Sequence, residues 1–288
     1  MATAHTLALS QFSANLRNIP MTQSAFNTFQ ALHRQAQPLL LANVWDAAST
    51  VLLQTDGAQA VATSSAAVAW SLGYADGSVL PEAELLSAIA RIMRVARVPV
   101  TVDFEDGYSS DPAAVAALAC KLANLGVVGV NLEDGLQPAQ LLVDKIVAIR
   151  VALDGTPLFI NARTDVFLKK IAQGPEAIAL CIERLSAYRA AGADGAFIPA
   201  MTKAEDAAQV IRGVDLPLNL MTLPTLDTIA SLAAVGVKRI SAGPALFQTT
   251  YAYGRAQASR FLSEGDASGL FANPLPGAVM NAAVQTLN

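Results

Sequence analysis

The stretch Val98-Pro99-Val100-Thr101-Val102-Asp103-Phe104-Glu105-Asp106-Gly107-Tyr108 begins as an apolar run and leads into three acids. Residues 98–102 predict a buried β-strand. Because successive side chains of a strand point to opposite faces, we expect Asp103 and Glu105 to share one side. Two carboxylates placed in this way repel each other unless a cation or a shared proton lies between them. The segment therefore predicts a site for a hard metal ion, with a solvated acidic loop as the alternative.

The composition predicts a chain with a large apolar core and no nucleic-acid or membrane partner. Of the 288 residues, 53% are hydrophobic and 15% are charged, and the formal net charge is −4. The basic residues are scattered, which argues against nucleic-acid binding. No apolar run approaches the roughly 18 residues that span a bilayer. Cys120 and Cys181 lie in helix-like stretches, and without a secretory signal they favour a reducing, cytoplasmic location.

The N-terminal part of the chain has a composition of its own. Residues 1–45 contain no Asp or Glu and several Ser and Thr, which faintly resembles a transit peptide. Because arginine is sparse there, a disordered or loosely docked segment is the simpler interpretation. His5 and His33, the two histidines, also precede the first predicted core strand. A His-ligated zinc site or a Ser-His-Asp triad therefore cannot form within the core.

Short apolar runs alternate with longer helical patterns along the chain. We predict strands at 38–43, 58–63, 98–103, 127–133, 157–163, 194–199, 216–221 and 237–241. Helical patterns lie near 46–55, 81–96, 111–125, 138–152, 175–191, 203–212, 225–235 and 244–263. Eight such units predict an α/β fold of the (β/α)8 TIM-barrel class. We predict an N-terminal extension at 1–35, the barrel at 36–264 and a C-terminal arm at 265–288. Within the barrel, a long loop is predicted at 64–80, after the second strand.

Polar residues follow most of the predicted strands, at the end where a barrel of this class forms its active site. They are Asn43, Trp45, Asp46, Ser64, Ser65, Asp103, Glu105, Asn131, Glu133, Asp134, Asn161, Arg163, Asp165 and Asn219. Ligation by oxygen alone selects Mg²⁺, Mn²⁺ or Ca²⁺. Arg163 offers a planar fork for a substrate carboxylate or phosphonate. An ion pair between Arg163 and Glu133 that only closes the rim is the alternative.

In these motifs the chain resembles the isocitrate lyase/phosphoenolpyruvate mutase superfamily, from about Leu39 to about Gly254. The matching segments are Val44-Trp45-Asp46-Ala47, Thr63-Ser64-Ser65, Gly73-Tyr74-Ala75-Asp76, Val102 to Tyr108, Asn131-Leu132-Glu133-Asp134 and Asn161-Ala162-Arg163. The resemblance implies enzymes that hold a 2-oxo acid through Mg²⁺, with Mn²⁺ as an alternative. It also implies that a C–C or P–C bond is made or broken next to an enolate.

The resemblance assigns roles to individual positions. Asp103 matches the principal Mg²⁺ ligand, and Glu105 matches an acid that acts through metal-bound water. The acids of the outer coordination sphere are matched by Asp76 and Glu133. The residues that contact substrate are expected to be Trp45, Ser64, Ser65, Asp103, Arg163 and Asn219. Catalytic roles fall to Arg163, Glu133 and a proton-managing group, for which the candidates are Tyr74, Tyr108 and Asp165.

Two departures place the chain in a short-loop branch of the superfamily, whose members are often named carboxyvinyl-carboxyphosphonate phosphorylmutase-like. The Lys-Lys-Cys-Gly-His loop of the isocitrate lyases is missing. The segment Glu133-Asp134-Gly135-Leu136-Gln137-Pro138 also leads almost directly into a helix, without the longer gating loop of the mutases. Ser65 stands where the resemblance expects glycine, which could narrow the pocket.

Three functional hypotheses follow. The first is a Mg²⁺-dependent lyase that cleaves a C–C bond of a small 2-oxo or 2-hydroxy dicarboxylate by aldol-type cleavage or decarboxylation. The second is P–C bond chemistry on a phosphonate, of the phosphonopyruvate hydrolase or phosphonomutase type, and the third is an inert 2-oxo-acid binder. The resemblance further implies a homo-oligomer, a dimer or tetramer, in which the last barrel helix near 244–263 is exchanged between subunits.

Overall fold

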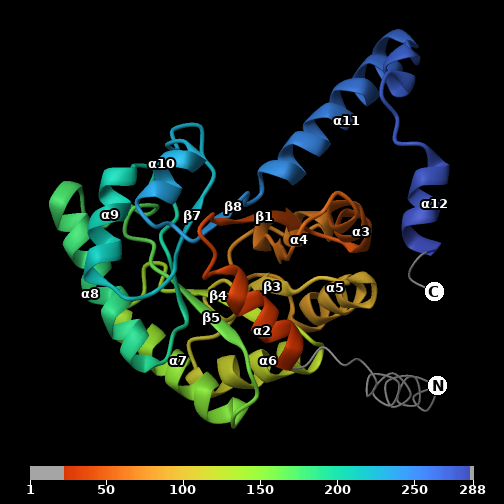
Figure 1. Cartoon of the computed structure of the whole chain (residues 1–288). Helices are drawn as coiled ribbons and strands as arrows, with labels where there is room; N and C mark the ends of the chain where they lie inside the picture. The colour runs from red at the N-terminus through yellow and green to blue at the C-terminus, as the bar shows by residue number, and fades with distance from the viewer. Residues whose placement is uncertain (1–22, 286–288) are drawn as a thin grey trace, which may run out of the picture.

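Eight parallel strands close into a barrel in the computed structural model, which describes residues 23–285 (Figure 1). Each strand pairs with its neighbours in chain order, and β1 pairs with β8. The strands are β1 Leu39–Val44, β2 Val61–Thr63, β3 Val100–Asp103, β4 Gly129–Glu133, β5 Phe159–Arg163, β6 Gly195–Phe197, β7 Leu218–Met221 and β8 Arg239–Ser241. The predicted (β/α)8 barrel is therefore confirmed.

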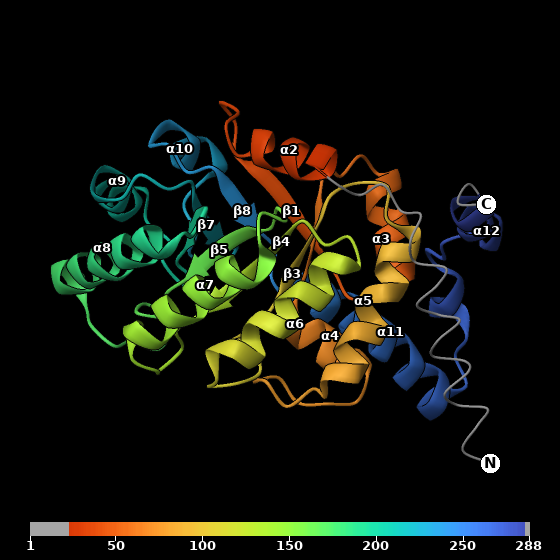
Figure 2. The same cartoon turned by 90° about the horizontal axis from the view of Figure 1, so that it is seen from below.

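Helices follow the strands, and all of them except the last, α11, cover the outside of the barrel (Figure 2). They are α3 Ala47–Thr55, α5 Glu82–Val95, α6 Pro112–Asn124, α7 Ala139–Leu153, α8 Gly174–Ala191, α9 Ala204–Gly213, α10 Ile229–Ala234 and α11 Ala245–Glu264. The outward strand residues, such as Val102 and Val130, pack with them in one large apolar cluster. In the described part of the chain, no helix is long and apolar enough to cross a membrane.

The prediction of a loop at 64–80 is partly wrong, because this segment contains a short helix, α4 Ser65–Ser71. Ser64 caps this helix, and its side chain accepts a hydrogen bond from the backbone N–H of Ala67. The pattern missed the helix because residues 66–69 are all buried and show no alternation of polar and apolar faces. The remaining loop runs from about residue 72 to the start of α5.

A helix before the first strand closes one end of the barrel. This helix, α2 Gln23–Leu32, lies in the segment predicted as an extension, where no helix was predicted. Its residues Phe29 and Leu32 pack into an apolar cluster with residues from the strand starts, including Phe159. The Phe29 ring meets the Phe159 ring edge-on at 5.4 Å, and the His33 ring stacks on Phe159 at 4.5 Å. His5 and the first 22 residues lie outside the described part.

The last barrel helix, α11, extends away from the barrel, and only Phe247 of its residues is buried (Figure 1). The outer face of β1 is correspondingly bare, since Leu40 is 56% exposed although its register partner Ile240 is buried. The C-terminal arm contains a 3-10 turn, η2 Ser268–Phe271, and a final helix, α12 Gly277–Gln285. Ala283 of α12 packs with Val51 and Val95 on the outside of the barrel.

If α2 is an integral plug, Phe29→Ala should lower the free energy of unfolding by about 3–5 kcal/mol, because it leaves a cavity in a fully buried cluster. Urea denaturation of the full chain measures this change. The exposed Thr28 of the same helix supplies the control, and Thr28→Ala should change stability by no more than about 0.5 kcal/mol. Equal effects of the two substitutions would show that α2 is only loosely docked.

Candidate active site

The polar side chains at the strand ends surround a cavity of about 210 Å³ at the carboxyl end of the barrel. Five of the predicted site residues line this cavity: Ser64, Ser65, Asp76, Asp103 and Arg163. A larger cavity of about 480 Å³ lies at the opposite end of the barrel, next to His33, and contains none of the predicted site residues. The candidate active site is therefore the smaller cavity, which lies where enzymes of this fold carry their chemistry.

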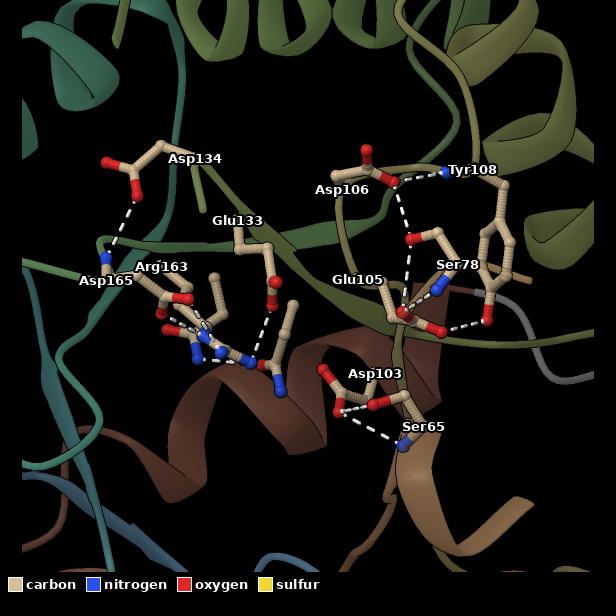
Figure 3. A network of polar contacts seen from close by, with 12 residues as sticks. Ser65, Ser78, Asp103, Glu105, Asp106, Tyr108, Glu133, Asp134, Arg163 and Asp165 are labelled. Carbon is tan, nitrogen blue, oxygen red and sulfur yellow. Dashed lines mark hydrogen bonds and ion pairs between the residues drawn. The ribbon is translucent and has the colours of Figure 1, made fainter. Parts of the chain in front are cut away.

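Strand β3 presents Asp103 to the cavity, while its neighbours Val100 and Val102 pack under the outer helices. The backbone N–H and the hydroxyl of Ser65 donate to Oδ2 of Asp103, at 3.1 and 2.8 Å (Figure 3). Oδ1 of Asp103 is buried and has no hydrogen-bond partner among the described residues. Since a buried, unpaired carboxylate oxygen is costly, Oδ1 marks the position at which a ligand would be held.

Glu105 is engaged differently from Asp103. The strand ends at Asp103, and Glu105 has a left-handed backbone with φ of +49°, so the alternation of faces does not extend to it. The hydroxyl of Tyr108 donates to Oε1 of Glu105 at 2.9 Å, and the N–H and hydroxyl of Ser78 donate to Oε2. Both carboxylate oxygens therefore have partners, and Glu105 does not line the cavity. Burial, together with the nearby charge of Asp103, raises its pKa.

Arg163 is clamped between two acids at the cavity wall (Figure 3). Its Nε and Nη2 donate to the two oxygens of Asp165, at 2.7 and 3.0 Å, and its Nη1 pairs with Glu133 at 2.6 Å. Burial opposes the charge of Arg163, but Glu133 and Asp165 outweigh this effect and raise its pKa. Arg163 thus forms the ion pair with Glu133 that was the alternative interpretation, and it also lines the cavity.

A buried carboxylate behind the rim holds this clamp in place. Asp134 accepts hydrogen bonds from the backbone N–H of Asp165, the hydroxyls of Thr164 and Tyr188, and Nη1 of Arg184, at 2.7–2.9 Å. Asp134 therefore fixes Asp165, which in turn fixes Arg163. The sequence indicated Asp134 only as a strand-end acid, and no pattern pointed to Arg184 or Tyr188, which come from α8.

The remaining acids leave the site short of positive charge. Burial raises the pKa of Glu133 to about 8, although the Arg163 partner opposes this shift. Burial and then repulsion by Asp103 raise the pKa of Asp76. Arg163 is the only cationic residue that lines the cavity in the described part of the chain. The acids therefore favour a bound cation or the uptake of protons.

Other predicted site residues do not line the cavity. Trp45 packs edge-on against Phe247 of α11, with ring centroids 5.2 Å apart. Asn219 is fully buried and donates to the carbonyl of Leu220. Tyr74 is half-buried and does not line the cavity, and neither does Tyr108. Several lining residues were not predicted as site residues, among them Asn43, Asn131, Leu168, Phe197, Met221 and Ser241. Of these residues, only Asn43 and Asn131 had been noted in the sequence, as polar residues at strand ends.

The donor set fits a divalent cation held mainly through water. The described residues contain no group of three or more His, Cys, Asp or Glu side chains that could hold a metal by themselves. Mg²⁺ usually takes only one or two protein carboxylates and keeps several waters. Asp103, with its unpaired Oδ1, satisfies that requirement, and Asp76 lines the same cavity.

A closed barrel whose carboxyl end holds a cavity lined by Arg163 and by a carboxylate with one unpaired oxygen has the architecture of a (β/α)8-barrel enzyme. Comparison with known proteins gives the family. The chain belongs to the phosphoenolpyruvate phosphomutase family, which matches residues 29–262. The resemblance found in the sequence motifs is thereby confirmed.

Individual relatives are similar over most of the chain. A Mycobacterium tuberculosis (strain H37Rv) protein of uncharacterised function is 34% identical over 246 residues, 83% of this chain and 90% of its own. The oxaloacetate decarboxylase of Ectopseudomonas mendocina is 30% identical over 229 residues, 77% of this chain and 79% of its own. A crystal structure from Burkholderia cenocepacia J2315, provisionally described as a phosphonomutase, is 36% identical with a TM-score of 0.79 and covers 83% of this chain and all of its own.

If the Arg163 clamp depends on charge, Asp165→Asn should lower the free energy of unfolding by about 3 kcal/mol, because it removes the buried partner of a guanidinium. Urea denaturation without added metal measures the loss. The matched control is Asp215→Asn, which alters an ion pair with Arg189 whose acid is 89% exposed, and its stability should not change measurably. A loss no larger than in the control would show that Asp165 does not hold Arg163.

Proposed function

We propose that this protein is a divalent-metal-dependent carbon–carbon lyase that decarboxylates a small 2-oxo dicarboxylate of the oxaloacetate type. The observation that carries the proposal is the pairing, on one cavity wall, of a single carboxylate-binding arginine with the unpaired Oδ1 of Asp103. The similarity to oxaloacetate decarboxylases supports the same reaction class. A cavity of about 210 Å³ suits a ligand of this small size.

In the proposed reaction, Asp103 holds the cation, with Mg²⁺ as the expected metal and Mn²⁺ as the alternative. When bound, the cation withdraws electrons from the substrate's oxo group and stabilises the negative charge that develops there. Arg163 binds a substrate carboxylate, and the Asp165 and Glu133 contacts fix the direction in which its guanidinium faces. The N-terminal end of α4, with Ser64 and Ser65, borders the oxo-acid pocket.

The proton-managing group stays a proposal. Tyr74 and Tyr108 were the candidates, with Asp165 as a further one, but Asp165 is fully buried and engaged with Arg163. The Tyr108 hydroxyl donates to Glu105, and burial raises its pKa, so it stays protonated. Glu133 acts in this scheme as the partner of Arg163 rather than as a metal ligand.

P–C bond chemistry is the second candidate, and the family description and the Burkholderia cenocepacia structure favour it. A transferring phosphoryl group requires several cationic contacts. Arg163 alone supplies a cationic side chain to the cavity lining in the described part of the chain. We therefore rank this reaction below decarboxylation, and an inert 2-oxo-acid binder below both.

Incubation with oxaloacetate and Mg²⁺ tests the proposed function. The unaltered protein should release pyruvate and CO₂ faster than Mg²⁺ alone, and chelation with EDTA should abolish this activity. Asp103→Ala should lower turnover by at least about 100-fold, because it removes the proposed cation ligand. The measurement is pyruvate formation followed by a coupled dehydrogenase assay.

The control is Asp144→Ala, which removes an exposed carboxylate from α7 and should leave turnover unchanged. Phosphonopyruvate, methylisocitrate and dimethylmalate are assayed in parallel. Phosphate release from phosphonopyruvate in the absence of oxaloacetate turnover would favour P–C chemistry. Binding of oxalate without turnover of any of the four compounds would favour the binder.

We further propose that the chain forms a homo-oligomer by exchange of α11. Two unpartnered surfaces support this arrangement: the bare outer face of β1 at Leu40, and the apolar side chains of α11 at Tyr251, Phe261 and Leu262. An exchanged α11 would cover both. A cytoplasmic location stays a prediction from the reduced cysteines.

Leu262→Glu should reduce the oligomer to a smaller species in sedimentation velocity, because the charge would have to be buried in the exchanged interface. Leu262 is 82% exposed in the isolated chain. The matched control is Val151→Glu on α7, where an apolar side chain is 75% exposed, and it should leave the species unchanged. A single monomeric species for the unaltered protein would contradict the exchange.

A further inference from the structure

Six buried side-chain atoms of the described residues have no hydrogen-bond partner, and all of them belong to inward-facing strand residues or to the His33 ring next to α2. They are His33 Nε2, Thr101 Oγ1, Asp103 Oδ1, Asn219 Oδ1, Arg239 Nε and Arg239 Nη1. Unpaired polar atoms are rare in folded proteins and mark places where polarity serves more than packing. Two of the six atoms belong to Arg239, which is the only cationic residue in this group of described residues.

Arg239 is fully buried inside the barrel, below the active-site cavity. It begins β8, and its register partner on β7 is Asn219. Its Nη2 donates to Oδ1 of Asn131 at 3.1 Å, and its guanidinium carbon lies 5.9 Å from the Phe29 ring centroid of the α2 plug. No ion pair to Arg239 is formed by the residues that the structure describes. A buried guanidinium without an acidic partner is expensive, and an apolar side chain would usually pack there more favourably.

Asn131 connects this charge to the cavity. It lines the cavity from β4, and its Oδ1 accepts hydrogen bonds from Arg239 and from Nδ2 of Asn161 at 2.9 Å. Exchanging the oxygen and nitrogen of the Asn131 amide would place its NH₂ group against these two donors, so the orientation of the amide is fixed. Arg239 therefore fixes Asn131 so that its Nδ2, a donor with no hydrogen-bond partner among the described residues, is available to a ligand. A donor in the cavity floor suits an anion.

The electrostatic surroundings of Arg239 point the same way. Burial lowers its pKa to about 9, and the charge of Asp103 partly restores it, so the group remains protonated at neutral pH. Asp103 is the only acid whose charge acts on it appreciably. A buried charge is also screened little by salt, and its influence on the cavity above it persists at physiological ionic strength.

We propose that Arg239 is a positioning residue of the active site, which orients Asn131 and supplies buried positive charge beneath the cavity for a dianionic 2-oxo acid. This inference rests on the proposed function, because it takes the cavity to be the substrate site. It identifies a second guanidinium, from the barrel interior, that complements Arg163 at the rim without touching substrate. The ligand class that it favours is a small dicarboxylate rather than a monoanion.

Isothermal titration of the full chain with oxalate in saturating Mg²⁺ tests the inference, with the thermal unfolding midpoint as a second measurement. Arg239→Met should weaken oxalate binding on the order of tenfold, since it removes a nearby buried charge. Its midpoint should stay equal or rise, because the substitution relieves an unpaired buried cation. Arg239→Lys, which keeps the charge, should bind within about threefold of the unaltered protein.

The matched control is Arg91→Met, which removes the same unit of charge from an exposed position on α5 and should bind oxalate normally. Failure of the unaltered protein to bind oxalate would overturn the proposed function, and the inference with it. Normal binding by Arg239→Met would overturn the inference alone. Weak binding accompanied by a lowered midpoint in both Arg239 variants would assign Arg239 a structural role and overturn the inference as well.

Discussion

Because the parallel strands close into a barrel, every second side chain of each strand points into one narrow interior. The side chains that fill this interior become more polar from the strand starts to the carboxyl ends. At the strand starts the interior is apolar, sealed by Phe29 of α2 against Phe159. Asparagines and Arg239 fill the middle, where Asn131 joins Arg239 and Asn161. Apart from Arg239, the charged side chains that the described strands turn inward lie at their carboxyl ends. Because the outward positions of the same strands stay apolar, the helices bind tightly around a core that is itself polar.

Excess negative charge at the rim then determines what the site can bind. The cluster contains Asp76, Asp103, Glu105 and Glu133, yet their surroundings differ. Glu105 is satisfied by Ser78 and Tyr108, and Glu133 by Arg163, whereas Asp103 keeps one oxygen unpaired. Although these acids share one sequence pattern, Glu105 and Glu133 are bound to other protein groups, whereas Asp103 keeps one oxygen without a protein partner among the described residues. For Glu105 the separation arises from hydrogen bonds across the loops, whereas Glu133 pairs with its register partner on β5.

The sequence allowed the barrel and the central acids to be predicted, because strand ends and helix patterns repeat along the whole chain. Asp103 and Arg163 were predicted from their place after apolar strands, and both line the cavity. Strand alternation alone did not place Glu105, because its backbone is left-handed and it does not line the cavity, and its role at a metal stays a prediction. The α2 plug and the Asp134 contacts to α8 depend on contacts between distant segments, for which local patterns carry no signal.

The segment that carries Asp76 is fastened to the loop after β3 by hydrogen bonds, and Asp76 itself lines the cavity. Ser78 in this segment, and Glu105 and Tyr108 opposite it, all have left-handed backbones, a conformation that is strained for residues with side chains. Hydrogen bonds from Ser78 to Glu105 and Asp106, and from Tyr108 to Glu105, hold these strained residues together. The acids of the D-x-E-D motif therefore have two tasks: Asp103 lines the cavity with one oxygen unpaired, whereas Glu105 and Asp106 fasten the segment that carries Asp76. Because the short connection after β4 adds no cation to the described cavity lining, the charge of this lining supports the proposed small carboxylate rather than a phosphoryl group as substrate.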